Sequence, residues 1–468
     1  MMRINKVLFM QIVGLLIFNL VSSNHLSAQE KISVVTKSEK KEFVNNASER
    51  LIERYVFKEI GEEVAGYISR RYEEGVYDTI TNAENFTRFM TEEIQSISHD
   101  KHMRVRLRRS RPQMESGPDP ILDQYFRTLE SQAENFGFQK VEILENNVGY
   151  VDFRYFASPF VAGDRVFAVM SFLKYTDAII FDLRKNGGGN PELIQLMCSY
   201  LFDEKVHLNS LYWREGDQTV EYWTLDQIEG ERMPHIPVYV LTSHYTFSGA
   251  EEFTYNLKTR NRATIIGETT GGGANPGGMQ QITERFGMFI PTGRAINPVT
   301  GTNWEGVGVE PDIKVEADSA LAVALKKAML VVKENKEKKI RNANDLVTNI
   351  HITENEVEDL IQAGKSDKAT EKLFQVLELG KKEGILNEIS INRLGYHFFG
   401  KNKNELALIV FKFNVKAYPE AFNTYDSLGE AFMKLDNIEQ AILNYEKSLE
   451  LNPNNKNADR MLEKLRTN

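Results

Sequence analysis

Cysteine is almost absent from this chain, since Cys198 is the only one among 468 residues. One thiol cannot form an internal disulfide, so the fold must be held together by its hydrophobic core. Cys198 lies within a predicted helix from Pro191 to Phe202, and we interpret it as a core residue rather than a nucleophile. Hydrophobic residues make up 41% of the chain and charged residues 26%. These fractions are ordinary for a folded soluble protein of about two to four domains.

A surplus of basic residues is also missing. Lysine and arginine number 57 against 66 aspartate and glutamate residues, which gives a formal net charge of −9. A general nucleic-acid binder would carry a basic footprint, so this class of protein is excluded.

The N-terminus predicts a signal peptide over residues 1–28. Arg3 and Lys6 precede an apolar run from Val7 to Val21, and Leu26–Gln29 reads as a small-residue cleavage site. The run is short for a membrane span, although an uncleaved anchor is the alternative. The segment contains no cysteine for a lipid anchor. We therefore expect an exported protein, periplasmic or extracellular, without a stable membrane span after cleavage.

The next part of the chain, residues 29–102, predicts a small helical domain. From Ser38 to Gln95 it has no proline and places apolar residues at helical spacing. Met103–Leu107 then alternates apolar residues with Arg104 and Arg106, which predicts a strand with arginines on its solvent face. Binding of a substrate carboxylate is the alternative role for these arginines.

Residues 103–318 predict an α/β core, because short apolar strands alternate with helices. The expected strands are Val148–Phe153, Asp177–Leu183, Val238–Leu241 and Ala263–Gly267, and the expected helices are Phe167–Tyr175, Pro191–Phe202 and Ala250–Leu257. Such alternation implies substantial parallel pairing. Residues 319–345 predict a final helix that grades into a charged linker.

The C-terminal part, residues 346–468, contains a repeat with a period of 34 residues. Leu394, Gly395, Phe398, Ala407, Phe411 and Pro419 recur as Leu428, Gly429, Phe432, Ala441, Tyr445 and Pro453. This period and spacing are typical of tetratricopeptide repeats, which are all-α helix–turn–helix units. A weaker helical pair at Glu356–Glu383 would supply a third unit. Such a stack binds a peptide or protein partner in its groove, or here braces the core.

Ser248 is the main candidate nucleophile. It follows the expected strand Val238–Leu241 and precedes the expected helix Ala250–Leu257. A serine on a strand-to-helix turn presents its hydroxyl above the sheet, which suits nucleophilic catalysis. A simple helix N-cap is the alternative.

A glycine-rich loop follows another expected strand, with Gly187, Gly188 and Gly189 in succession before the helix at Pro191. Consecutive glycines allow backbone N–H groups to approach a ligand closely. No Lys-Ser/Thr pair follows them, so a P-loop is excluded, and the spacing does not fit a dinucleotide site. An oxyanion hole is the remaining interpretation.

Four ordered blocks resemble the carboxyl-terminal-processing (tail-specific) serine peptidase family. They are Asp182–Gly189, Thr246–Phe253, Gly267–Gly271 and Gly306–Asp312. The similarity extends over about Asn147–Val315, and the helical segment before it resembles the N-terminal domain of the retinoid-binding-protein-like and tricorn-like branch. The resemblance implies a crotonase-like β/α core, hydrolysis of peptide bonds as a serine-type endopeptidase, and Ser248 as nucleophile.

The sequence departs from the family pattern at two places. Members with a Ser–Lys dyad carry a lysine at the position of Gly273, but no lysine occurs between Lys258 and Lys314. The stretch from Met103 to Glu142 is also too short for the PDZ domain that many members insert there.

A serine hydroxyl needs an adjacent base. By resemblance to the tricorn-like branch, this base is His102, with His99 in reserve, and the third member is Glu305, six residues before Pro311. The implied oxyanion donors are the amides of Gly249 and Gly188.

Three alternatives to this interpretation remain open. His99, Asp100 and His102 could form half of a metal site, although no further cysteine or histidine pair supports one, and we expect no cofactor. His244 lies four residues before Ser248 and is an alternative base. A catalytically idle core that binds a ligand, or a scaffold of the cell envelope, is the alternative to a peptidase.

Overall fold

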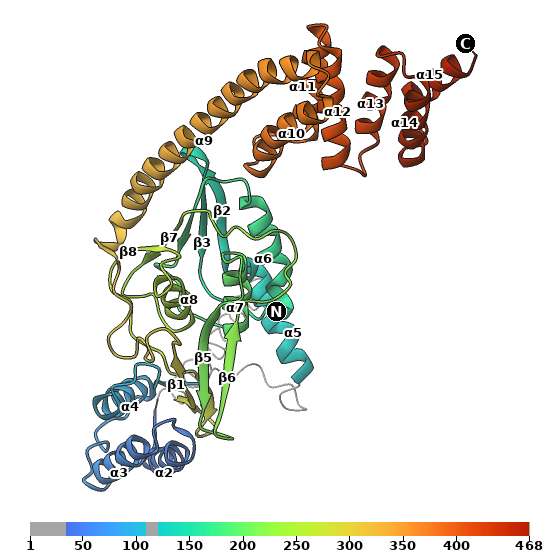
Figure 1. Ribbon diagram of the computed structural model, residues 1–468. Helices are drawn as coiled ribbons and strands as arrows, with labels where there is room; N and C mark the ends of the chain where they lie inside the picture. Colours follow the sequence, from blue (N-terminus) through green and yellow to red (C-terminus); the bar gives the residue numbers. More distant parts are fainter. Residues whose placement is uncertain (1–33, 109–119, 468) are drawn as a thin grey trace, which may run out of the picture. The chain divides into compact units, whose positions relative to one another are not determined.

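The computed structural model describes residues 34–108 and 120–467. The predicted signal peptide lies outside these residues. The chain divides into two compact units, one up to Val332 and one from Lys333 onward, and we describe each by itself (Figure 1). No helix within the described ranges is long and apolar enough to cross a membrane.

Three helices open the first unit: α2 (Lys37–Arg54), α3 (Lys58–Glu73) and α4 (Ala83–Ser98). They occupy the range that the sequence predicts to be helical. The Thr36 hydroxyl and the Glu39 carboxylate accept each other's backbone N–H groups, which caps α2. The buried face of these helices shares one hydrophobic core with strand β10 (Phe286–Pro291). This shared core fixes the end of α4, and hence Asp100 and His102, against the rest of the unit.

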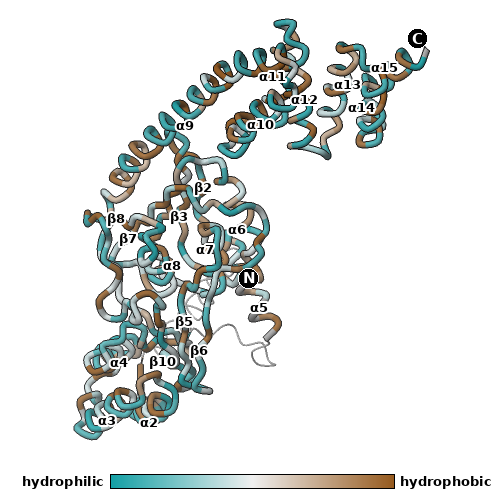
Figure 2. The backbone as a smooth tube through the Cα atoms, viewed as in Figure 1, coloured by the Kyte–Doolittle hydropathy of each residue, from teal (hydrophilic) through white to brown (hydrophobic). Residues whose placement is uncertain are grey.

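A six-stranded sheet forms the centre of the unit, in the order β12-β8-β7-β4-β3-β2. Its four pairs from β12 to β3 are parallel and only the β2–β3 pair is antiparallel, which confirms the expected α/β layering. The strands are β2 (Phe138–Leu144), β3 (Val148–Phe153), β4 (Ala178–Asp182), β7 (Val238–Thr242), β8 (Thr264–Gly267) and β12 (Ile313–Lys314). Figure 2 shows hydrophobic residues along β3 and β7 in the middle of the sheet.

Helices cover both faces of this sheet. One face packs against α6 (Pro159–Leu173), α7 (Pro191–Ser199) and α8 (Gly249–Lys258). The other face packs against the start of α9 (Ala317–Gln362), through a stripe at every fourth residue: Ala320, Ala324, Ala328 and Val332. The strands are therefore buried on both sides and read as continuous apolar runs, which is why their prediction was straightforward.

Two antiparallel three-stranded sheets complete the unit. One is β1 (Val105–Leu107), β10 and β9 (Gly277–Gln281), and the other is β11 (Gly293–Ile296), β5 (His207–Trp213) and β6 (Gln218–Trp223). In β1, Val105 is buried and Arg106 is exposed, as the alternation predicts. Helix α5 (Pro120–Ala133) and two 3₁₀ turns, η1 (Asn135–Gly137) and η2 (Glu145–Asn147), complete the connections.

The second unit is helical. After the remainder of α9 come α10 (Ser366–Lys382), α11 (Glu388–Gly400), α12 (Asn404–Ala417), α13 (Phe422–Lys434), α14 (Ile438–Leu451) and α15 (Lys456–Thr467). The α13–α14 pair repeats α11–α12 at the predicted spacing of 34 residues. The tetratricopeptide assignment itself stays a prediction.

One sequence expectation is wrong in this region. The charged stretch before residue 346, predicted to be a linker, continues α9 as a helix. Residues 317–363 contain neither glycine nor proline, and their lysine, glutamate and alanine residues favour a helix even when solvated. The helix ends just before Gly364, whose φ of 69° is left-handed.

Candidate active site

Ser248 lies on a sharp turn between the central strand β7 and helix α8. Its backbone has φ 56° and ψ −123°, which differs from the extended conformation of an ordinary N-cap. Non-glycine residues in such strained conformations gather at functional sites. Buried Thr246 holds the turn, because its hydroxyl donates to the Leu183 carbonyl at 2.8 Å. The turn therefore presents Ser248 at the carboxyl edge of the parallel strands, where open α/β sheets bind ligands.

The Glu251 side chain holds the strained turn through hydrogen bonds. Its buried carboxylate accepts the Ser248 amide at 2.8 Å, the Thr270 hydroxyl at 2.5 Å, and the amides of Gly272 and Gly273 at 2.6 and 2.8 Å. Burial raises the pKa of Glu251, while these hydrogen bonds act to lower it. Glu251 thus joins the Ser248 turn to the loop that follows β8. Sequence reasoning missed this role, and its only signal was a glutamate three residues after a serine, the pattern of a capping box.

The glycine-rich loop packs directly on this turn. A Cβ at Gly188 would lie 2.6 Å from the Gly249 nitrogen, so only glycine allows the loop to approach Ser248 this closely. However, the Gly188 N–H already donates to the buried Asn186 side chain at 2.8 Å. This amide is therefore already paired within the loop, and its expected role as an oxyanion donor stays a prediction. Gly249 is the first residue of α8, where a helical N–H has no intrahelical acceptor.

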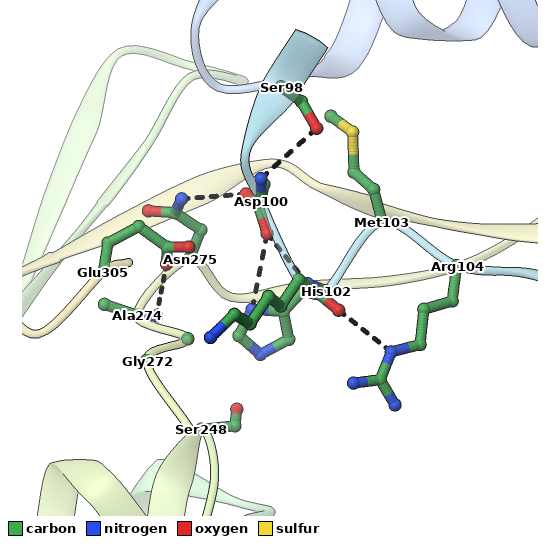
Figure 3. A network of polar contacts seen from close by, with 12 residues as sticks. Ser98, Asp100, His102, Met103, Arg104, Ser248, Gly272, Ala274, Asn275 and Glu305 are labelled. Carbon is green, nitrogen blue, oxygen red and sulfur yellow. Dashed lines mark hydrogen bonds and ion pairs between the residues drawn. The ribbon is translucent and has the colours of Figure 1, made fainter. Parts of the chain in front are cut away.

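His102 lies beside the same turn. It follows the C-terminal end of α4, the last of the three N-terminal helices. Its ring contacts Phe247 at 4.6 Å between centroids and stacks on Phe289 of β10 at 5.5 Å. The residue is only 9% exposed, and both ring nitrogens are buried without a hydrogen-bond partner. Figure 3 shows the Ser248 hydroxyl on the side of the ring opposite the nitrogen that faces Asp100. His99, in contrast, is exposed at the left-handed C-cap of α4.

The His102 ring also explains the missing lysine. A Cβ at Gly273 would lie 2.7 Å from Cε1 of His102 and 2.3 Å from Cζ of Phe247. No side chain fits at this position while both rings are in place. Family members with a Ser–Lys dyad are expected to carry a lysine at this position. Here the imidazole and the Phe247 ring fill that space.

Two carboxylates accompany His102. Asp100 accepts the His102 amide at 2.9 Å, and one of its oxygens lies 3.7 Å from the ring Nδ1. Burial, and next the negative charge of Asp100, raise the pKa of Glu305 to about 8. Ligand atoms of Asp100, His102 and Glu305 all lie within 4.8 Å of one another, and within the described ranges this is the group that could hold a metal ion. In the sequence, Asp100 was noted only as part of a possible metal half-site with His99 and His102.

The other two candidates from the sequence, His244 and Arg104, lie at the surface. His244 is exposed, and its Nδ1 is 3.0 Å from a Glu268 oxygen, so it pairs with a carboxylate of the neighbouring loop. Arg104 is exposed and lies over the Phe247 ring at 5.5 Å. The structure therefore brings together His102, Ser248 and Glu305, and leaves His99 and His244 at the surface.

Comparison with known proteins finds sequence similarity over two ranges of the chain. Residues 147–315 match the sequence model of peptidase family S41, and residues 25–138 match the N-terminal domain of peptidase S41 in eukaryotic IRBP. The tricorn protease of Thermoplasma volcanium is 28% identical over 144 residues, which are 30% of this chain and 12% of that protein. The chain thus spans about an eighth of the length of this curated relative.

Solved structures match parts of the chain at low sequence identity and low TM-score. A photosystem II D1 C-terminal processing protease is 21% identical with a TM-score of 0.30, over 36% of this chain and 43% of that one. A lipoprotein from Streptococcus agalactiae is 13% identical with a TM-score of 0.40, over 62% of this chain and 96% of that one. Residues 147–315 are thus similar in sequence to peptidase family S41, and residues 25–138 to the N-terminal domain of that family in eukaryotic IRBP.

Proposed function

We propose that this protein is an exported serine peptidase that hydrolyses peptide bonds through an acyl-enzyme. The observation that supports the proposal most is the buried imidazole of His102, with both nitrogens unpartnered, beside the strained turn of Ser248. A buried polar group without a partner is costly, and catalytic hydrogen bonds often form only when substrate binds. We therefore assign the role of general base to His102.

The reaction follows from this placement. Ser248 Oγ attacks the scissile carbonyl carbon while His102 takes its proton. The C–N bond then breaks as His102 passes that proton to the leaving amine, and the acyl group remains as an ester on Ser248. Water then attacks the ester carbon while His102 takes a proton from it, and the C–O bond to Ser248 breaks as His102 returns the proton to Oγ. The Gly249 amide stabilises the oxyanion, and the Gly188 amide joins it once it leaves Asn186. Glu305 and Asp100 are the carboxylates beside the base.

A fluorophosphonate probe tests the nucleophile directly. We expect Ser248 to be labelled and Ser248→Ala to lose both labelling and peptide cleavage while keeping its melting temperature. Ser319→Ala, at an exposed serine of α9, is the matched control and should behave as the unmodified chain. Cleavage that persists in Ser248→Ala would refute the proposal.

A ligand-binding core without turnover is the second candidate. It is favoured by one observation, the occupied Gly188 amide, because a working oxyanion hole needs its donors free. Absence of labelling in the unmodified, folded chain would select this candidate. In either case, we propose that the helix pairs of the second unit hold a peptide or protein partner.

A further inference from the structure

We propose that the outer edge of β2 pairs with the same strand of a second copy of this chain, which gives a two-fold dimer with one sheet running through both copies. The inference goes beyond the proposed function and does not depend on it. β2 forms one end of the six-stranded sheet, and among the described residues its strand partner is β3 alone (Figure 1). The other end is β12, which has only two residues. Of the two ends, β2 therefore offers the longer row of unpaired backbone groups.

The charges on β2 are arranged symmetrically about Val141. Lys140 precedes it and Glu142 follows it, and their side chains form an ion pair of 2.5 Å within the strand. Antiparallel pairing centred on Val141 places Lys140 of each copy directly opposite Glu142 of the other, and such opposite charges stabilise a pair of strands. A shift of the centre to Lys140 or to Glu142 brings two like charges face to face. Charged residues on an edge strand hinder pairing with unrelated strands, but their order here permits pairing with a copy of β2.

The strand has regular geometry where this pairing would form. Lys140–Leu144 pair in sequence with β3, and the one irregularity in the ladder lies just before them. Successive side chains therefore alternate between the two faces of the sheet. Lys140 and Glu142 share the face on which Lys140 lies over the Tyr150 ring, 6.0 Å from its centroid. The irregularity bends the strand and confines regular pairing to a short stretch, so a dimer built on it should be weak and depend on protein concentration.

A pocket of about 250 Å³ lies beside this edge, between β2 and α6. Five of its seven lining residues are apolar, among them Val141 of β2 and Phe172 of α6. Phe172 is 52% exposed, and so is 49% of Ile143, which shares a face of β2 with Val141. Pairing centred on Val141 brings Ile143 of the second copy diagonally beside Val141, within side-chain reach. The pairing therefore removes apolar surface from water next to the charged positions.

Sedimentation equilibrium of the full chain tests the pairing. We expect the average mass to rise toward that of two chains as the protein concentration is raised from about 5 to about 500 µM. Lys140→Glu places two carboxylates opposite each other, and Glu142→Lys places two ammonium groups opposite each other. Each variant should raise the Kd of the dimer by about 10-fold or more, because a two-fold interface repeats every clash. The double variant restores opposite charges and should return the Kd to within about 3-fold of the unmodified value.

A mixture of the two single variants separates pairing between copies from effects within one strand. Each variant has lost the ion pair inside β2, but a mixed dimer has opposite charges at both facing positions. We therefore expect the equimolar mixture to associate about 10-fold or more tightly than either variant alone. Lys174→Glu is the matched control, because Lys174 also forms a surface ion pair, 2.8 Å from Glu231, and it should leave association unchanged. Melting temperatures show that each variant remains folded.

Three results would overturn the proposal. The first is an unmodified chain that stays monomeric at about 500 µM, and the second is a mixture that associates no better than the separate variants. The third is a loss of association in Lys174→Glu as large as in Lys140→Glu, since the effect would then not belong to β2. Fluorophosphonate labelling of Ser248 in the same samples reports on the proposed peptidase function alone, because no residue of β2 belongs to the candidate active site.

Discussion

Gly273 shows how one residue decides which base can serve Ser248. The imidazole of His102 and the ring of Phe247 fill the volume where a side chain at position 273 would begin. A lysine in this loop and a histidine at position 102 therefore exclude each other sterically. Because there is no room at position 273 for even one methyl group, replacing Gly273 with alanine already tests this steric exclusion.

We expect Gly273→Ala to slow fluorophosphonate labelling by about 10-fold or more, since displacing the base by a fraction of an ångström misaligns proton transfer. Its overpacking should lower stability by about 1–3 kcal/mol. Gly278→Ala is the control, because nothing lies within 4 Å of a Cβ at that site. Labelling rates and thermal melts of the two variants make the comparison. Equal labelling rates would show that the His102 ring is not held against Gly273.

The raised pKa of Glu305 predicts how the stability of the folded protein changes with pH. A carboxyl whose pKa rises on folding from 4.5 to about 8 binds its proton more tightly in the folded state. Its contribution is fully present below pH 4.5 and is lost as pH rises through about 8. We therefore expect the melting temperature of the unmodified chain to fall relative to Glu305→Gln over this range. Buried Glu252, with a pKa raised to about 7, titrates in both proteins and cancels in the difference. A constant difference from pH 5 to pH 9 would contradict the prediction.

At the scale of elements, the sequence predicts four parallel strands that are buried on both faces and misses most of the antiparallel strands. Strands β3, β4, β7 and β8 are continuous apolar runs, and each was expected within about two residues. Strands β2, β5, β6, β9, β10, β11 and β12 were not predicted. β6 is mostly exposed, and β9 alternates glycine, methionine and glutamine with little burial. Antiparallel strands of this kind are defined by their partners across a turn rather than by their own composition.

The glycine that recurs in each 34-residue repeat has a packing role, which one substitution in α11 can test. A Cβ at Gly395 of α11 would lie 2.6 Å from the Phe411 ring of α12, and a Cβ at Gly429 would lie 3.1 Å from the Tyr445 ring. Glycine therefore lets the two helices of each pair approach until an aromatic ring fills the gap. We expect Gly395→Ala to destabilise the second unit by about 1–3 kcal/mol.

Gly400→Ala, at the end of the same helix, is the control, because nothing lies within 4 Å of its Cβ. It should be neutral or stabilising by about 0.5–1 kcal/mol through helix propensity. Chemical denaturation of the full chain, followed by circular dichroism, reports both variants. Similar effects of the two substitutions would refute the packing argument.

For the whole molecule, the site depends on segments that are far apart in the chain. His102 follows α4, Ser248 follows β7, and Glu305 lies in a loop before β12, so about 200 residues separate the first from the last. Sequence motifs identified each residue by its local pattern and by resemblance. They could not show that an Asp100 oxygen lies 3.7 Å from the ring Nδ1, because that distance depends on packing between the helical segment and β10.

The boundary between the two units gives the last prediction. Ala320, Ala324, Ala328 and Val332 cover one face of the central sheet, whereas the chain from Lys333 onward belongs to the second unit. A chain that ends at Asn335 keeps this stripe, and we expect it to fold and to be labelled at Ser248 within about 2-fold of the full-length rate. A chain that ends at Asp318 loses the stripe and exposes Ile180 and Leu241, which should cost more than about 3 kcal/mol of stability. Thermal melts and labelling rates distinguish them. Loss of labelling in a folded chain that ends at Asn335 would show that the helical repeat region takes part in catalysis, because the sheet, the Ser248 turn and the His102 segment are all retained in that chain.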